Sequence, residues 1–185
     1  MQLLTHKFTT EQFHQMGEAQ IFPPSDRLEL IEGEVITMSP IGFRHAATIN
    51  RLLDQFLTLQ LQKRTIISIQ NSLRLAPHSE PQPDLVLLKP REDFYAHQLP
   101  QAQDVLLLIE VADSSLSYDR EIKIPLYAKH RINEVWLVNL NQAQLEVYHS
   151  PQEGYYQDQT ILTAPQTLTS LAFPELEITL TRILN

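Results

Sequence analysis

The segment Val105-Leu106-Leu107-Leu108-Ile109-Glu110 places a carboxylate directly after five consecutive apolar residues. A similar run, Pro83-Asp84-Leu85-Val86-Leu87-Leu88, precedes it in the chain and begins with an acid after a proline. Short continuous apolar runs are typical of strands that are buried on both faces in the middle of a sheet. We therefore expect these two segments to form the centre of a sheet, with one acid at an end of each strand.

The segments around these two runs show the periodicities of further strands and helices. Apolar residues recur with a helical period from about 43 to 63, which predicts a long amphipathic helix packed against the sheet. Gly33 separates two alternating segments, 27–31 and 35–38, which predicts a β-hairpin. Further strands are expected at 65–70, 72–75, 134–139, 145–148 and 155–162, and further helices at 11–17 and 118–130, the last one kinked or restarted at Pro125.

The length and composition are those of one domain without covalent cross-links. The chain has 185 residues and contains neither cysteine nor internal repeats. We therefore expect a single domain over 1–185, with no disulfide, thiolate metal site or cysteine nucleophile. No apolar run approaches the roughly 20 residues of a transmembrane helix, and the first residues lack the pattern of an export signal. These features predict a cytoplasmic protein with no membrane partner.

The net charge is negative. The sequence has 14 Lys and Arg residues against 22 Asp and Glu residues, a formal charge of -8. Such a charge repels a polyanion, which argues against sequence-independent coating of nucleic acid. It does not exclude an enzyme that acts on nucleic acid, because carboxylates that hold a divalent cation are part of the negative count.

The acids Asp84 and Glu110 are the first candidates for a functional site. A carboxylate at the end of an apolar strand is a local inconsistency of the kind that function explains. If the two strands are neighbours, the two acids could share a magnesium ion, which prefers oxygen ligands. In the alternative interpretation, Asp84 caps a turn after Pro83 and Glu110 points into solvent. Spacing alone does not separate the two interpretations.

A polar stripe follows in the next helix-like segment. Asp119, Lys123 and Tyr127 recur every four residues and would lie on one helix face. A lysine near a metal-bound phosphate could orient water or stabilise negative charge, and a tyrosine could donate a hydrogen bond beside it. The alternative is a solvated Asp-Lys ion pair with a half-buried tyrosine, and spacing alone favours this alternative.

The order of these motifs along the chain resembles the Uma-two family of restriction-endonuclease-like proteins. The resemblance covers about residues 8 to 150 and rests on the combination of motifs rather than on any one of them. The residues that carry it are Arg27-Leu28-Glu29-Leu30-Ile31-Glu32-Gly33-Glu34, Met38-Ser39-Pro40, His45, Pro83-Asp84-Leu85-Val86, Glu110-Val111, Asp119, Lys123, Tyr127 and Val135-Trp136-Leu137-Val138.

The resemblance implies the PD-(D/E)XK nuclease fold, an α/β (α+β) arrangement in which helices flank a mixed β-sheet. In that fold an aspartate and a second acid bind magnesium or manganese for phosphodiester hydrolysis, and Asp84 and Glu110 match these two acids. The backbone carbonyl of Val111 matches a further metal ligand. Ala112 stands where such nucleases usually carry a lysine, and Lys123 matches the helix lysine that the family recruits instead.

Three further positions match the family. Glu34 is a candidate site acid beside the expected hairpin, as a ligand or next to one. His45 enters the long helix, where its imidazole could meet a phosphate or form a structural hydrogen bond. Trp136 lies in an apolar strand, which favours core packing or a dimer contact over base stacking.

Two functions follow from the resemblance. In the first, the protein is a magnesium- or manganese-dependent endonuclease that hydrolyses DNA. The two strand acids hold the cation, Lys123 assists, and Arg120, Lys129 and Arg131 add local positive charge. In the second, the nuclease fold serves as a non-catalytic interaction or nucleic-acid-binding module, which the displaced lysine and the acidic charge favour. A homodimer is expected if both strands of a duplex are cut.

Overall fold

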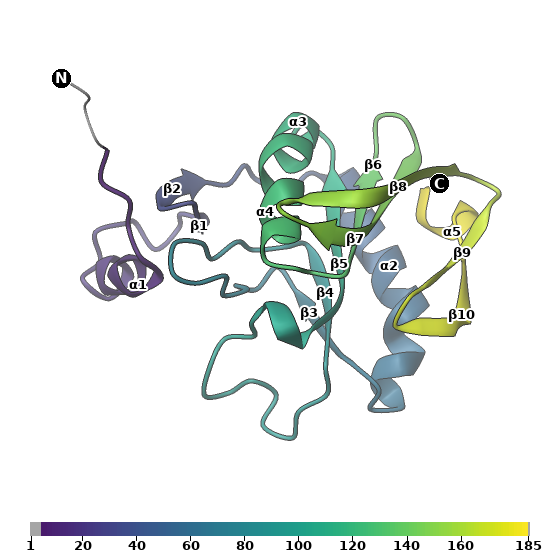
Figure 1. Ribbon diagram of the computed structural model, residues 1–185, viewed down its shortest axis with the longest axis horizontal. Helices are drawn as coiled ribbons and strands as arrows, with labels where there is room; N and C mark the ends of the chain where they lie inside the picture. Colours follow the sequence, from purple (N-terminus) through teal and green to yellow (C-terminus); the bar gives the residue numbers. More distant parts are fainter. Residues whose placement is uncertain (1–4, 185) are drawn as a thin grey trace.

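The two apolar runs lie side by side in the middle of one sheet (Figure 1). The structure is a computed structural model that describes residues 5–184. The runs form β4 (Leu85–Leu88) and β5 (Val105–Ala112), which pair in antiparallel orientation. All four residues of β4 and seven of the eight residues of β5 are buried. The prediction that both are central strands is therefore confirmed.

The sheet has six strands in the order β3-β4-β5-β6-β7-β8. Strands β5 and β6 run parallel, whereas every other neighbouring pair is antiparallel. The sheet is thus mixed and flanked by helices, as predicted. Its remaining strands are β3 (Ile66–Ile69), β6 (Glu134–Asn139), β7 (Gln144–Gln152) and β8 (Tyr155–Thr163).

Helices cover both faces of the sheet, so the strands contribute to two separate cores. On one face, the long helix α2 (Phe43–Leu61) buries Phe56 in one core with Trp136. On the other face, α4 (Ile124–Lys129) buries Leu126 in a second core with Leu108. The predicted long helix is confirmed, and Trp136 is a fully buried core residue.

The helical segment that connects β5 to β6 is not a continuous α-helix. It consists of α3 (Leu116–Tyr118), a π-helical turn η2 (Asp119–Lys123) and then α4. The amide of Ile124 donates to the carbonyl oxygen of Asp119, five residues earlier. Pro125, which has no N–H, occupies one of the first positions of α4. The prediction of a kinked or restarted helix at Pro125 is therefore confirmed to within one residue, since the new segment begins at Ile124.

Residues 72–75 do not form a strand of the sheet, contrary to the sequence prediction. The amide of Leu73 donates to the carbonyl of Pro81, and the amide of Leu75 donates to the carbonyl of Ser79. The chain between β3 and β4 therefore folds back on itself instead of pairing with the sheet. Both leucines are buried in the second core, which accounts for their apolar alternation.

The predicted hairpin is confirmed and lies at one end of the molecule, next to α1 (Thr10–Glu18) (Figure 1). It consists of β1 (Leu28–Ile31) and β2 (Glu34–Thr37). Gly33 has a φ of 80° in the turn, and a Cβ there would lie 2.6 Å from the Cβ of Lys7. Glycine is therefore needed both for the left-handed backbone and for the close approach.

The part of the chain after β8 forms a small unit that the sequence patterns did not predict. Its elements are β9 (Thr167–Ser170), β10 (Phe173–Thr179) and α5 (Thr181–Leu184), and they lie at the end of the molecule away from α1 (Figure 1). A short 3-10 helix, η1 (Ala102–Asp104), precedes β5. No helix within residues 5–184 combines the length and the apolar character needed to cross a membrane.

Candidate active site

Asp84 and Glu110 face each other across the ladder between β4 and β5. The ladder ends at this side with the pair of Leu85 and Ile109, and the two acids are the next residues beyond it in the two chain segments. The amide of Asp84 donates to Oε2 of Glu110 at 3.3 Å, and the amide of Val111 donates to Oδ2 of Asp84 at 2.9 Å. Glu110 is only 2% exposed, so the interpretation in which it points into solvent is wrong.

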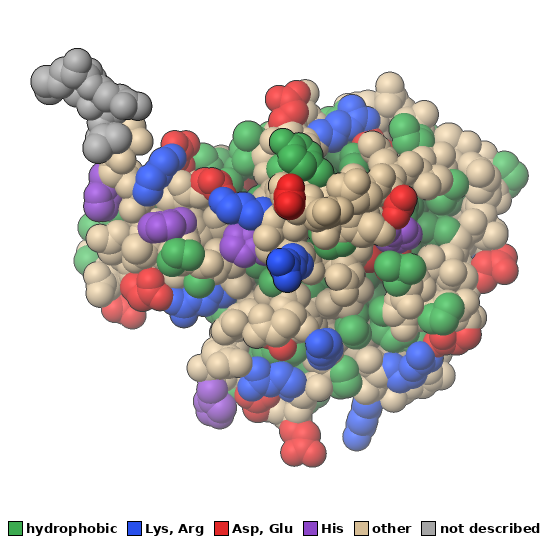
Figure 2. Space-filling model, in the orientation of Figure 1, with side chains coloured by type: hydrophobic (Ala, Val, Ile, Leu, Met, Phe, Trp, Pro, Cys, Tyr) green, Lys and Arg blue, Asp and Glu red, His purple; other side chains and the backbone are tan. Residues whose placement is uncertain are grey.

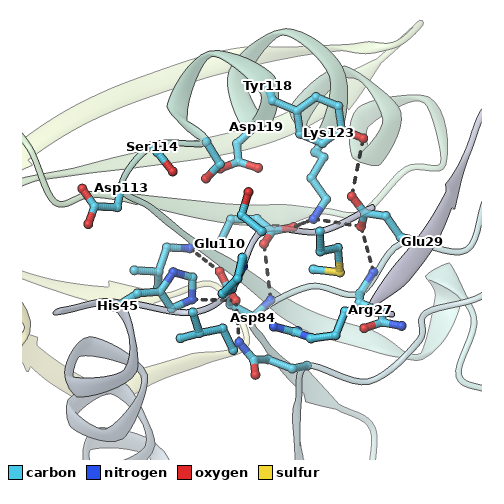
Figure 3. Close-up of a pocket in the computed structure, with 18 of the residues that line it drawn as sticks. Arg27, Glu29, His45, Asp84, Glu110, Asp113, Ser114, Tyr118, Asp119 and Lys123 are labelled. Atoms are coloured by element: carbon cyan, nitrogen blue, oxygen red, sulfur yellow. Dashed lines mark hydrogen bonds and ion pairs between the residues drawn. The ribbon is translucent and has the colours of Figure 1, made fainter. Parts of the chain in front are cut away.

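The two acids line a cavity of about 500 Å³ (Figure 3). Its walls come from the hairpin and the segment 38–42 on one side and from residues 113–123 on the other. Val111, whose carbonyl is the third expected metal ligand, also lines this cavity. The structure therefore brings together the three expected metal ligands at one end of the central strands.

Lys123 extends from η2 to Glu110, one of the two strand acids. Its Nζ lies 2.9 Å from Oε1 of Glu110 and 3.3 Å from Oε2 of Glu29. The hydroxyl of Tyr127 donates to the same oxygen of Glu110. Both Lys123 and Tyr127 are buried, so the interpretation as a solvated ion pair with a half-buried tyrosine is wrong. Asp119, the third member of the stripe, is also buried and accepts a hydrogen bond from Ser115.

Glu29 is a member of the cavity to which the sequence analysis gave no role. It lies in β1, is 2% exposed, and contacts Lys123 from the side opposite to Glu110 (Figure 3). The amide of Gln82 and the hydroxyl of Tyr118 also donate to its carboxylate. In the sequence, an acid between two leucines is the ordinary alternation of a half-exposed strand. Its burial depends on Lys123, which is distant in the chain, so no local pattern shows it.

Glu34 does not belong to this cavity, contrary to the expectation from the sequence. Its side chain is 63% exposed and pairs with Lys7 at 2.5 Å. The physical reason is its place just after the hairpin turn, at the start of β2, where it faces solvent. The acid that the hairpin contributes to the cavity is Glu29 in β1.

His45 reaches Asp84 from the first turn of α2. Its Nε2 lies 2.8 Å from Oδ1 of Asp84, and the side-chain amide of Gln70 donates to the same oxygen at 3.1 Å. The structural hydrogen bond considered for His45 is therefore present, and its partner is one of the two strand acids. Asp84 is thus held by donors from three different parts of the chain, counting the Val111 amide.

The surroundings shift the pKa values of the site in opposite directions. Burial opposes ionisation of Asp84, but the hydrogen bond and charge of His45 hold the pKa of Asp84 below its usual value. Burial raises the pKa of Glu110 and Asp84 adds to this shift, whereas the ammonium of Lys123, 2.9 Å away, opposes it and favours the carboxylate. Burial alone would lower the pKa of Lys123, yet the carboxylates of Glu110 and Glu29 raise it, so its ammonium stays charged.

The donor set of the cavity fits a hard divalent cation. Among the described residues, Oδ2 of Asp84 and Oε2 of Glu110 each accept a single hydrogen bond, which leaves each oxygen a lone pair for a metal. No group of three His, Asp or Glu side chains with metal-binding geometry occurs within residues 5–184. Magnesium suits such a set, because it commonly takes one or two carboxylates and fills its other positions with water and phosphate oxygens.

The basic residues that the sequence placed beside the cleft are located elsewhere. Arg120 and Lys129 form ion pairs with carboxylates outside the cavity. Neither they nor Arg131 line it, and the cations that do are Lys123 and Arg27. Of the basic residues expected from this helical segment, only Lys123 therefore belongs to the cavity lining.

The fold and the paired acids define a restriction-endonuclease-like protein, and the comparisons agree. The model of the Uma2 (Uma-two) family, described as "Putative restriction endonuclease", matches residues 10–181. The chain therefore belongs to this family, which confirms the resemblance seen in the sequence. A crystal structure of a "putative nuclease belonging to DUF820" from Anabaena variabilis ATCC 29413 has a similar fold, with a TM-score of 0.70 and 17% identity over 91% of this chain and 96% of that chain. No curated protein matches the chain.

Proposed function

We propose that the protein is a metal-dependent nuclease that hydrolyses phosphodiester bonds of DNA in the cavity at the end of β4 and β5. The observation that carries the proposal is the arrangement of Asp84 and Glu110, which face each other with the ammonium of Lys123 on Glu110. Family membership supports nuclease chemistry and a DNA substrate. The burial of all three groups supports function rather than a solvated surface cluster.

The carboxylates of Asp84 and Glu110 and the carbonyl of Val111 would hold the magnesium or manganese ion. Such an ion, when bound, polarises a phosphate and lowers the pKa of water. Asp84 is suited to bind it because His45 and Val111 keep this carboxyl ionised. Lys123 places a permanent positive charge beside Glu110, where it can stabilise the negative charge that develops on the reacting phosphate.

The remaining groups of the site position these three. Tyr127 donates a hydrogen bond to Glu110 and so fixes the orientation of its carboxylate. Glu29 contacts Lys123 from the opposite side and so limits the directions in which the ammonium can point. A site whose charged groups are held in this way needs little reorganisation when charge develops on the substrate.

The test is cleavage of supercoiled, linear and single-stranded DNA with magnesium or manganese by the wild-type protein and by Asp84→Ala. We expect metal-dependent cleavage by the wild type and none by the variant. Glu34→Gln is the control, because Glu34 is an exposed acid of the hairpin that lies outside the cavity, and this variant should cleave like the wild type. Equal cleavage by Asp84→Ala would show that the activity comes from a contaminant or another site. If the wild type is folded but does not bind metal and does not cleave DNA, the result would favour the non-catalytic binding module.

A further inference from the structure

The acid pair lies at the floor of the cavity and not on an open surface. The side chain of Asp84 is 10% exposed and that of Glu110 is 3% exposed. The cavity volume of about 500 Å³ falls in the range of roughly 300–1,000 Å³ that is usual for pockets that enclose small ligands. A phosphate must therefore enter the cavity to reach the acids. A phosphate of an intact duplex stays on the outside of a stiff helix, whereas an unpaired strand can bend inward.

The charges of the cavity suit a substrate that makes few phosphate contacts. Two permanently charged cations, Arg27 and Lys123, line it, together with His45, which is engaged by Asp84. Five acids line it as well, and Lys123 is already engaged by two of them. These acids are Glu29, Asp84, Glu110, Asp113 and Asp119.

The outer surface offers no continuous basic patch on the face in view. Figure 2 shows the blue Lys and Arg side chains there scattered singly among red and purple ones. Seven cations outside the cavity lining form ion pairs with carboxylates, namely Lys7, Arg44, Arg64, Arg74, Arg91, Arg120 and Lys129. Proteins that bind a duplex through many phosphates present a basic patch or stripe instead.

An exposed aromatic residue adjoins the cavity lining along the chain, although it does not itself line the cavity. Phe43, the first residue of α2, is 86% exposed, so the core does not account for it. Ile41 and Gly42 before it and His45 after it all line the cavity. Unpaired bases stack on aromatic side chains in proteins that bind single strands, whatever the base. The bases of a duplex are already stacked on one another and do not need such a contact.

We propose that the substrate of this site is an unpaired DNA strand, whose scissile phosphate enters the cavity while a neighbouring base stacks on Phe43. The statement about hydrolysis rests on the proposed nuclease function, whereas the preference for an unpaired strand is a property of binding. It follows from the depth of the acid pair, the small number of cations and the position of Phe43.

The binding test compares a fluorescent single-stranded oligonucleotide with a duplex of the same sequence, by anisotropy in the presence of calcium. The single strand should bind at least ten-fold more tightly. Its affinity should fall with salt as expected for about three or fewer phosphate contacts, that is, with a log-log slope no steeper than about -2. A duplex that binds equally well or more tightly would overturn the proposal.

The matched variants are Phe43→Ala and Phe94→Ala. Phe94 is also a highly exposed phenylalanine, at 72%, but it lies in the loop after β4, at the opposite end of that strand from Asp84. Phe43→Ala should weaken single-strand binding at least five-fold, and Phe94→Ala should leave it unchanged. If the two variants bind the single strand with equal affinity, Phe43 does not bind DNA and the proposed role is overturned. The same result is expected if Phe43 contacts another protein instead.

A cleavage experiment distinguishes a failure of this inference from a failure of the proposed nuclease function. The wild type is given manganese with a single strand, a duplex, and a duplex that carries a single-stranded overhang. Cleavage should be confined to the unpaired parts, and cleavage inside the duplex at an equal rate would overturn the inference while supporting the nuclease function. If nothing is cleaved, the proposed hydrolysis is contradicted, and the binding comparison still decides the preference for an unpaired strand.

Discussion

Lys123 and Glu110 form a buried ion pair, with Nζ 2.9 Å from Oε1, although one residue belongs to a helical turn and the other to the central strand of the sheet. Both side chains are less than 5% exposed. A buried charge that loses its partner is strongly destabilising. The contact that builds the candidate site therefore also fixes the position of η2 against β5.

Replacing Lys123 by methionine should lower the free energy of unfolding by about 3–5 kcal/mol, because Glu110 and Glu29 would remain buried without a cation. Urea unfolding measures this change. The double variant Lys123→Met/Glu110→Gln also removes one of the two carboxylates that are left without a cation. It should therefore recover part of the lost free energy of unfolding. If the losses of the two single variants simply add in the double variant, the ion pair is not the cause.

Replacing Glu29 by glutamine should reduce turnover of DNA at least ten-fold and leave metal affinity unchanged. The amide keeps the shape of the side chain but not the charge that holds Lys123 in place. Steady-state kinetics and calorimetric titration with manganese measure the two quantities. Glu34→Gln, which alters an exposed acid outside the cavity, is the control. A loss of metal affinity equal to the loss of turnover would make Glu29 a metal ligand instead of a positioning residue.

Magnesium at 100 times its dissociation constant should stabilise the wild type by about 2.7 kcal/mol, because it binds the folded chain and not the unfolded one. Asp84→Asn should show no such stabilisation, since it removes one of the two carboxylates that face each other. Chemical unfolding with and without the ion measures the difference. Equal stabilisation of both proteins would place the metal elsewhere.

The burial of Asp119 predicts a dependence of stability on pH. Burial raises the pKa of Asp119 to about 6, against an ordinary value of 3.8, with Lys123 opposing the shift. The folded state therefore holds a proton that the unfolded state releases, so this group makes the wild type less stable as pH rises from about 4 to about 6. Asp119→Asn lacks this loss. Its free energy of unfolding relative to that of the wild type should rise over that interval by up to about 3 kcal/mol, measured by urea unfolding. A difference between the two proteins that stays constant with pH would show that Asp119 is ionised throughout.

The central strands could be predicted because their pattern is local. Two uninterrupted apolar runs require burial on both faces, and the acids at their ends stood out for the same reason. Residues 72–75 show the limit of such patterns. Leu73 and Leu75 alternate like strand residues, but their backbone bonds close a local loop, and the sequence does not state which partner an amide will take.

The candidate site could be predicted only in part because its polar groups are buried by contacts between distant segments. The spacing of Asp119, Lys123 and Tyr127 is the same for a solvated helix face and for a buried one. What decides between the two is the presence of Glu29 and Glu110 on the facing strands. The sequence analysis expected Glu34 rather than Glu29 at the site, since both acids lie in the same hairpin and only the fold shows which one lines the cavity.

The π-helical turn η2 makes the site sensitive to chain length as well as to residue type. A turn closed over five residues instead of four contains one more residue than an α-helix would, and each helical residue rotates the following side chains by about 100°. Removing one residue between 119 and 123 would restore a regular helix, and both hydrophobic cores would stay populated. Asp119 and Lys123, which both line the cavity, would then be rotated relative to each other. Relatives in which this segment is one residue shorter should therefore keep the fold and lose the charge arrangement of the cavity.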